Sequence, residues 1–302
     1  MPDFEAQVEM SAEAKLELSR TKATCPFIGS AVVEGILPVR NDAENPLASI
    51  DDVRRLGNQH PGDDLGELLA LFATGNHALM RNSDGHLLSS VPTGLFSLDF
   101  PPSQGSHPGD SGILQRDLQH PRFSEDDFNR LASRASSGRL TRQAVGDFIA
   151  ENVHRDPNAR TLGREEVERM GLELSAFVGA EIHAAGEKLL GRAQEASATQ
   201  RLATEKFTNL LADDNIVGSS GEFGLLFTLL SGRPDAIDDE GEPVLLLDDV
   251  RMMFQEKHLP AGWNQGRKTR SDWARHTFAI ASSAYGSFHQ LTSKAGAESP
   301  ET

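Results

Sequence analysis

The cysteine at position 25 is the only one among the 302 residues, and its position in the sequence suits reactive chemistry. It is followed by Pro26, and proline favours the first turn of a helix because the N–H that it lacks would have no partner there. We therefore expect a helix to begin at this point, with Cys25 as its N-cap. The sulfur would then face free amide N–H groups and the positive end of the helix dipole, which favour a thiolate. A thiolate so placed can act as a nucleophile, as a redox centre or as an axial ligand of haem iron.

Cys25 also has a second interpretation, which its position alone favours. A lone cysteine is most often a small apolar residue of the core with no chemical role. Other motifs offer less: the sequence Asp110-Ser111-Gly112 fits a turn, because a helical chain lacks the β scaffold and the histidine and acid pattern of trypsin-like nucleophiles. The histidines show neither HxxxH nor HExxH spacing, so we expect no histidine-only metal site.

Helices must position any such site, because helix signals recur along the chain and strand signals are scarce. We predict an all-α fold in a single compact multi-helix domain over residues 21–292, after a flexible segment 1–20 and before a disordered tail 293–302. Residues 82–121 show neither the helical nor the strand period of apolar residues. We therefore predict that this segment is a long irregular insertion that covers a pocket. One predicted helix follows Cys25-Pro26, another starts at Ser124, and two long helices lie within 164–212. The other predicted helices cover 49–56, 63–81, 141–152, 219–230, 247–257 and 271–291.

The charge balance limits the partners that we expect for this chain. It carries 45 acidic and 29 basic residues, for a net charge of −16. This charge opposes binding to nucleic-acid backbones and to anionic lipid. The densest basic run, from Arg267 to Arg270, is interpreted as the solvated start of a helix. The sequence shows neither a signal peptide nor an apolar run of membrane-spanning length, so we expect a cytoplasmic protein without a membrane partner.

Three separated segments share a further pattern with a known family. The first begins with Cys25-Pro26 and continues to Gly35-Ile-Leu-Pro38, and the second is Gly138-Arg-Leu-Thr-Arg142. The third begins with Gly221-Glu222 and ends with Leu259-Pro260-Ala-Gly-Trp263. In this order the segments resemble the haem-thiolate peroxidase family, the group of chloroperoxidase and the unspecific peroxygenases.

This resemblance implies a helical domain around a haem pocket and an oxidoreductase. It implies a b-type haem at Cys25-Pro26, with the Cys25 thiolate as the axial ligand of the iron, and hydrogen peroxide as the oxidant. Glu222 would be the catalytic general acid–base, although an exposed acid in the first turn of a helix is its plainer interpretation. Small organic molecules or halide would be the substrates.

The sequence departs from the family at the site of the divalent ion and in the distal pocket. The family has an acidic triplet that holds magnesium or manganese beside a haem propionate, and here those positions are Ala135, Ser136 and Ser137. Asn215 stands where the longer peroxygenases have an arginine, seven residues before the glutamate.

Without the acidic triplet, the propionates need another cationic partner. Arg134, Arg139 and Arg142 lie on the predicted hairpin, and a guanidinium can pair with a carboxylate through two parallel hydrogen bonds. We therefore expect one or more of them to hold a propionate, and the alternative is that they are solvated surface residues.

Two other classes of function stay open at this point. One is a helical haem-binding or small-ligand-binding protein that kept the fold without turnover. The other is an interaction protein in which Cys25 is structural and the resemblance is accidental. The absorption spectrum of the purified protein distinguishes these classes, because only thiolate-ligated haem gives a strongly red-shifted ferrous-carbonyl band.

Overall fold

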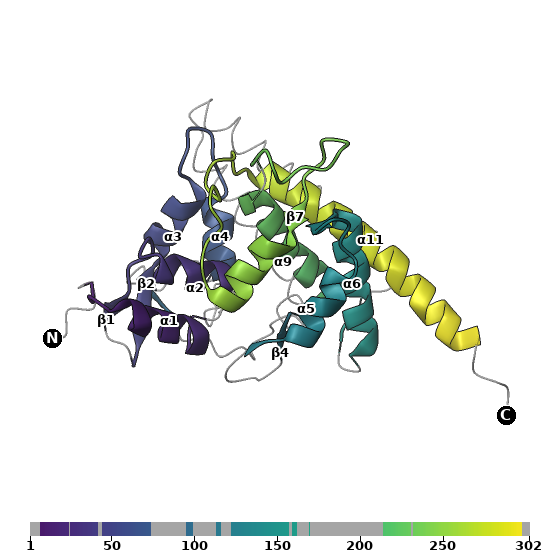
Figure 1. Cartoon of the computed structure of the whole chain (residues 1–302), viewed down its shortest axis with the longest axis horizontal. Coiled ribbons are helices and arrows are strands. Elements are labelled where there is room, and N and C mark those ends of the chain that lie inside the picture. Colours follow the sequence, from purple (N-terminus) through teal and green to yellow (C-terminus); the bar gives the residue numbers. More distant parts are fainter. Residues whose placement is uncertain are drawn as a thin grey trace.

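The structure is a computed structural model that is mostly helical, with short antiparallel strand pairs between the helices. Figure 1 shows the N-terminal helices on one side and the C-terminal helices on the other, with the two chain ends far apart. The structure describes residues 7–23, 25–41, 44–73, 95–98, 113–115, 122–156, 159–161, 169, 214–230 and 232–297.

The N-terminal part contains four short helices in two packed pairs. Helix α1 (Ala12–Thr21) packs against α2 (Pro26–Val33), and α3 (Ile50–Gly57) packs against α4 (Gly66–Ala73). The predicted helices after Cys25-Pro26 and over 49–56 are confirmed. For the helix predicted over 63–81, the described part is α4.

Helix α1 lies largely within residues 1–20, the segment that the sequence predicts to be flexible. Ser11 caps the helix, since its hydroxyl accepts a hydrogen bond from the backbone N–H of Ala14 at 3.2 Å. Leu18 and Ser19 are buried, so the helix belongs to the core. The sequence did not indicate this helix, because its apolar residues show only a weak helical period.

The sequence predicts an all-α fold without strands. The structure differs because short strands lie between the helices. The longest is β2 (Pro46–Ser49), which pairs with β1 (Arg40–Asn41) and with β3 (Leu95–Ser97) in antiparallel registers. Two further pairs join β4 (Leu114–Gln115) to β5 (Arg122–Phe123) and β6 (Arg139–Leu140) to β7 (Leu245–Leu246). Strands of two to four residues are too short to show an alternating pattern in the sequence. Of the insertion predicted over 82–121, the described parts are 95–98 and 113–115, and each contributes a strand.

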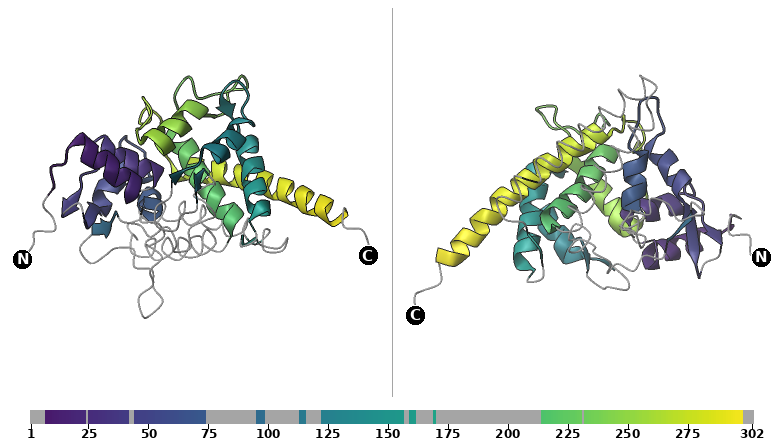
Figure 2. Two further views of the ribbon diagram at one scale, coloured as in Figure 1. Left: turned by 60° about the horizontal axis from the view of Figure 1, so that its bottom comes forward. Right: turned by 180° about the vertical axis from the view of Figure 1, so that it is seen from behind.

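The described residues of the C-terminal part include three longer helices. Helix α11 (Arg270–Ala297) packs along both α6 (Arg142–Arg155) and α9 (Asn215–Leu230), and α5 (Glu125–Ala132) packs on α6. Figure 2 shows from behind that α11 crosses this part of the molecule and extends beyond its neighbours at the C-terminal end. The helix predicted over 271–291 is therefore confirmed and is longer at its end.

Local capping explains where these helices begin. Ser124 and Thr141 accept hydrogen bonds from Asp127 N–H and Ala144 N–H at 3.3 and 3.2 Å, so the starts predicted at both positions are confirmed. Helix α9 begins earlier than the predicted residue 219, because the buried Asp214 carboxylate accepts a hydrogen bond from Val217 N–H at 2.8 Å. The helices predicted over 164–212 lie outside the described residues, apart from Arg169, which is helical.

The segment after β7 continues as two short helical pieces. Helix α10 (Leu247–Arg251) passes directly into the π-helix η3 (Met252–Glu256). Lys257 ends it in the left-handed conformation with φ 63°. The helix predicted over 247–257 is thus present, with a widened last turn.

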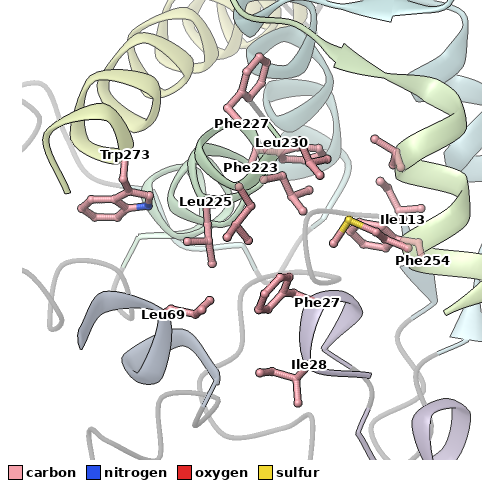
Figure 3. Packing of buried hydrophobic residues seen from close by; sticks show 14 of the residues in the cluster. Phe27, Ile28, Leu69, Ile113, Phe223, Leu225, Phe227, Leu230, Phe254 and Trp273 are labelled. Atoms are coloured by element: carbon pink, nitrogen blue, oxygen red, sulfur yellow. The ribbon is translucent and has the colours of Figure 1, made fainter. Parts of the chain in front are cut away.

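The core lies between the N-terminal and C-terminal helices. Figure 3 shows Phe27 of α2 and Leu69 of α4 pointing toward α9, where Phe223 and Leu225 face them. Trp273 of α11 is fully buried beside this group. Among the described residues, no helix is both long and apolar enough to cross a membrane.

Candidate functional site

Cys25 is the N-cap of α2, as the sequence predicts. Pro26 occupies the first helical position, and the Cys25 carbonyl accepts the first-turn hydrogen bond from Gly29 N–H at 2.8 Å. The side chain is half-buried and packs against the hydrophobic core. The sulfur makes no capping hydrogen bond to α2, and its position at the positive end of the helix dipole would favour a thiolate.

Helix α2 is apolar because it runs through the core, with buried residues from Phe27 to Val32. Phe27, two residues after Cys25, meets the Trp263 ring edge-on with centroids 5.5 Å apart. The Nζ of Lys268 lies 5.4 Å from the centroid of that same indole. One aromatic side chain therefore contacts both the first turn of α2 and a lysine from the opposite end of the sequence.

Glu222 lies on α9, the helix that faces α2 across the core. All residues of α9 are buried except Asn215 and Glu222, which are half-exposed. Seven residues correspond to about two helical turns, so both side chains lie on one face of α9. The adjacent Gly221 carbonyl accepts a hydrogen bond from Trp273 Nε1 at 3.0 Å, which holds this turn against α11. Glu222 is thus a side chain of the interior helix and not an exposed acid of its first turn.

Two of the three predicted propionate partners are engaged with glutamates. Arg134 lies 2.5 Å from a carboxylate oxygen of Glu151, and Arg142 lies 2.5 Å from one of Glu242. Arg139 is half-buried on β6. The structure therefore leaves Arg139 as the candidate of this group whose guanidinium pairs with no carboxylate among the described residues.

The segment that replaces the family's acidic triplet forms a tight turn. Ser137 and Gly138 adopt positive φ angles of 50° and 74°, and Ser136 N–H donates to the Arg139 carbonyl at 3.0 Å. No group of three or more His, Cys, Asp or Glu side chains within the described ranges could hold a metal ion.

Lys268 is a residue of this region that sequence reasoning missed. The run from Arg267 to Arg270 was predicted to be solvated, yet the Lys268 side chain is fully buried. Burial lowers the pKa of its ammonium, and the charge of Asp63 opposes part of that change. No signal in the sequence distinguishes Lys268 from its exposed neighbours, because the Trp263 ring and the loop at Asp63 that cover it are brought there by the fold.

His276 was also missed, and it lies where α6, α9 and α11 meet. Its ring is fully buried and stacks on Phe227 of α9 with centroids 5.3 Å apart. Neither ring nitrogen has a hydrogen-bond partner among the described residues. Burial, followed by the charges of Arg275 and Arg142, lowers the pKa of His276 to about 4, so the imidazole is neutral near pH 7.

Comparison with known proteins identifies no relative of this chain, since no family model, curated protein or solved structure matches it. A function must therefore be inferred from its own residues and their geometry.

Proposed function

We propose that this protein is a haem-thiolate peroxidase or peroxygenase that uses hydrogen peroxide to oxidise small organic molecules or halide. The observation that carries the proposal is the geometry at Cys25. Its side chain is half-buried at the N-terminus of α2 and packs against the hydrophobic core. A position at the positive end of a helix dipole favours the thiolate form that an iron ligand requires.

The aromatic pair of Phe27 and Trp263 at the first turn of α2 has chemistry that suits a porphyrin. The Cys25 sulfur would hold the iron of a bound haem. A thiolate-ligated haem supplies the peroxide-dependent oxidation, because the sulfur donates electron density that favours O–O cleavage.

Glu222 performs the proton transfer in this proposal. With haem bound, the Glu222 carboxylate would accept a proton from peroxide and give it to the oxygen that leaves, which requires reach to both atoms and a suitable pKa. The support is its place on the helix that faces α2, together with its partial exposure in an otherwise buried helix.

The test is the absorption spectrum of the full chain reconstituted with haem b. We expect a Soret band whose ferrous-carbonyl form is strongly red-shifted, and loss of that shift in Cys25→Ala. The variant removes one small half-buried side chain, so its thermal unfolding should stay close to that of the wild type. A protein that takes up no haem, or a Cys25→Ala variant with the wild-type spectrum, would contradict the proposal.

A non-catalytic haem-binding or small-ligand-binding protein is the second candidate. Ala135, Ser136 and Ser137 in place of the family's acidic triplet, and Asn215 in place of its distal arginine, favour this second candidate. Hydrogen peroxide with a chromogenic donor separates the two functions. Haem binding without oxidation of the donor would identify the binder.

A further inference from the structure

The start of α11 is tied to the loop between α3 and α4. The Asp64 N–H donates to the Lys268 carbonyl at 3.1 Å, and the Asp64 carboxylate accepts a hydrogen bond from the Arg270 N–H at 2.7 Å. The Asp63 carboxylate accepts one from the Lys268 N–H at 2.9 Å. Hydrogen bonds between two segments that lie far apart in the sequence therefore hold the chain just before α11 in place.

That part of the chain, residues 263–269, lies over the first turn of α2. Trp263 meets the ring of Phe27 there. Just before this segment the chain is anchored, because the buried Arg233 donates a hydrogen bond to the Ala261 carbonyl at 2.9 Å. Residues 263–269 thus form a short connection between an anchored residue and a long helix.

Lys268 is the least favourable part of this closed arrangement. Its side chain is fully buried, and its Nζ donates to one acceptor among the described residues, the Gly266 carbonyl at 3.2 Å. The Trp263 ring, with its centroid 5.4 Å from Nζ, adds a cation–π contact. An ammonium has three N–H donors, so two of them lack a conventional acceptor in this part of the structure.

The buried ammonium raises the free energy of the closed state. Burial of a charged group with unfilled hydrogen bonds is unfavourable, and a cation–π contact offsets only part of this penalty. The charge of Asp63 acts on the ammonium, but the carboxylate accepts its hydrogen bonds from the backbone N–H groups of Lys268 and His60. Water would fill the remaining donors of Nζ if the segment moved outward, so the penalty is relieved in an open state.

We propose that residues 263–269 form a latch that opens locally while the rest of the fold stays intact, and that the buried ammonium of Lys268 sets how often it opens. Opening brings Nζ into water and separates Trp263 from Phe27, which uncovers the first turn of α2. The hydrogen bonds of Asp63 and Asp64 oppose the opening. Local opening of this kind occurs where few contacts hold a segment. The inference involves no ligand and is independent of the proposed function.

The experiment is amide hydrogen exchange of the full chain, followed by NMR. The reporters are the backbone amides of residues 64, 268 and 270, whose hydrogen bonds hold the latch. In the wild type we expect them to be at least tenfold less protected than amides inside the buried helix α9.

Variants then test the role of the charge. Lys268→Met has a side chain of similar length without the ammonium, so it should raise the protection of all three reporters by roughly tenfold or more. Asp64→Ala removes an acceptor and should lower the protection at residues 64 and 268. The control is Lys15→Met at a half-exposed position of α1, which should leave the reporters unchanged.

Two results would overturn the inference. Wild-type reporters as well protected as the amides of α9 would show that no local opening takes place, and this comparison needs no variant. Equal or lower protection in Lys268→Met would show that the buried charge does not set the opening. Lys268→Gln, which is neutral and keeps a donor for the Gly266 carbonyl, repeats this second test in case the methionine variant does not fold.

Discussion

Glu222 and Asn215 give α9 its polar face. Helix α9 is otherwise buried, so a carboxylate on it is held at a defined place by packing on all other sides. Asn215 carries an amide, which is not a base, and its side-chain oxygen accepts a hydrogen bond from the Arg160 backbone N–H at 2.5 Å. On the proposed function, proton transfer on this face would therefore depend on Glu222.

Replacement of Glu222 tests that dependence. Glu222→Gln keeps the shape of the side chain and removes its basicity, so peroxide turnover should fall by roughly 10²–10⁴ while the haem spectrum is retained. Stopped-flow measurement of donor oxidation checks it. The matched control is Glu256→Gln at the exposed end of the π-helix, which should turn over as the wild type does. Wild-type rates in Glu222→Gln would remove the residue from the mechanism.

Helices α9 and α11 approach each other closely because a glycine stands at their contact. A Cβ at Gly224 would lie 3.0 Å from the Thr277 backbone nitrogen and would also meet the Thr277 hydroxyl. Contacts this short require the helices to move apart or the side chain to be absent. The turn that carries Glu222 is therefore positioned by backbone proximity to α11 as well as by the Trp273 hydrogen bond.

A pair of glycine substitutions measures this approach. Gly224→Ala should destabilise the fold by about 1–3 kcal/mol, because overpacking outweighs the gain in helix propensity. Gly286→Ala, on the exposed side of α11 with nothing within 4 Å of the new Cβ, should instead stabilise by up to about 1 kcal/mol. Urea unfolding of both variants checks the signs. Two changes of the same sign would show that α9 and α11 do not pack as described.

At the scale of the whole molecule, the junction of α6, α9 and α11 depends on a neutral imidazole. His276 is buried there against Phe227, and the guanidinium of Arg142 from α6 acts on it, whereas Asp272 alone favours its protonation. Protonation inside the fold is therefore unfavourable, while the unfolded chain accepts the proton near the ordinary pKa of 6.5.

This difference predicts how stability changes with pH. Between pH 6.5 and about 4 the unfolded chain binds more protons at His276 than the folded chain, so the stability of the fold decreases as the pH falls through this range. The loss from this one group approaches about 3 kcal/mol at pH 4. His276→Phe, which preserves the stacking on Phe227, should flatten the slope in urea unfolding between pH 4 and 6.5. An unchanged slope would show that other groups cause the acid sensitivity.

The sequence predicted features that depend on neighbouring residues and missed those that depend on distant ones. The helix starts at Pro26, Ser124 and Thr141 follow from one residue and the turn after it, so they could be predicted. The burial of Lys268 and His276 could not, because the rings of Trp263 and Phe227 that cover them come from other elements. For the same reason, only part of the candidate site could be predicted. Local sequence patterns indicate Cys25 and Glu222, whereas no local pattern indicates the side chains around them.

The two tryptophans of this chain have an optical consequence. Trp263 and Trp273 are the only ones in the sequence, and both lie beside the candidate site, the first against Phe27 and the second against Phe72 with centroids 6.0 Å apart. Trp263 is half-exposed and Trp273 is fully buried, so their emission maxima should differ. A porphyrin between α2 and α9 would accept excitation energy from both indoles. On the proposed function, native fluorescence would therefore report porphyrin binding without a label, because the sequence contains no other indole.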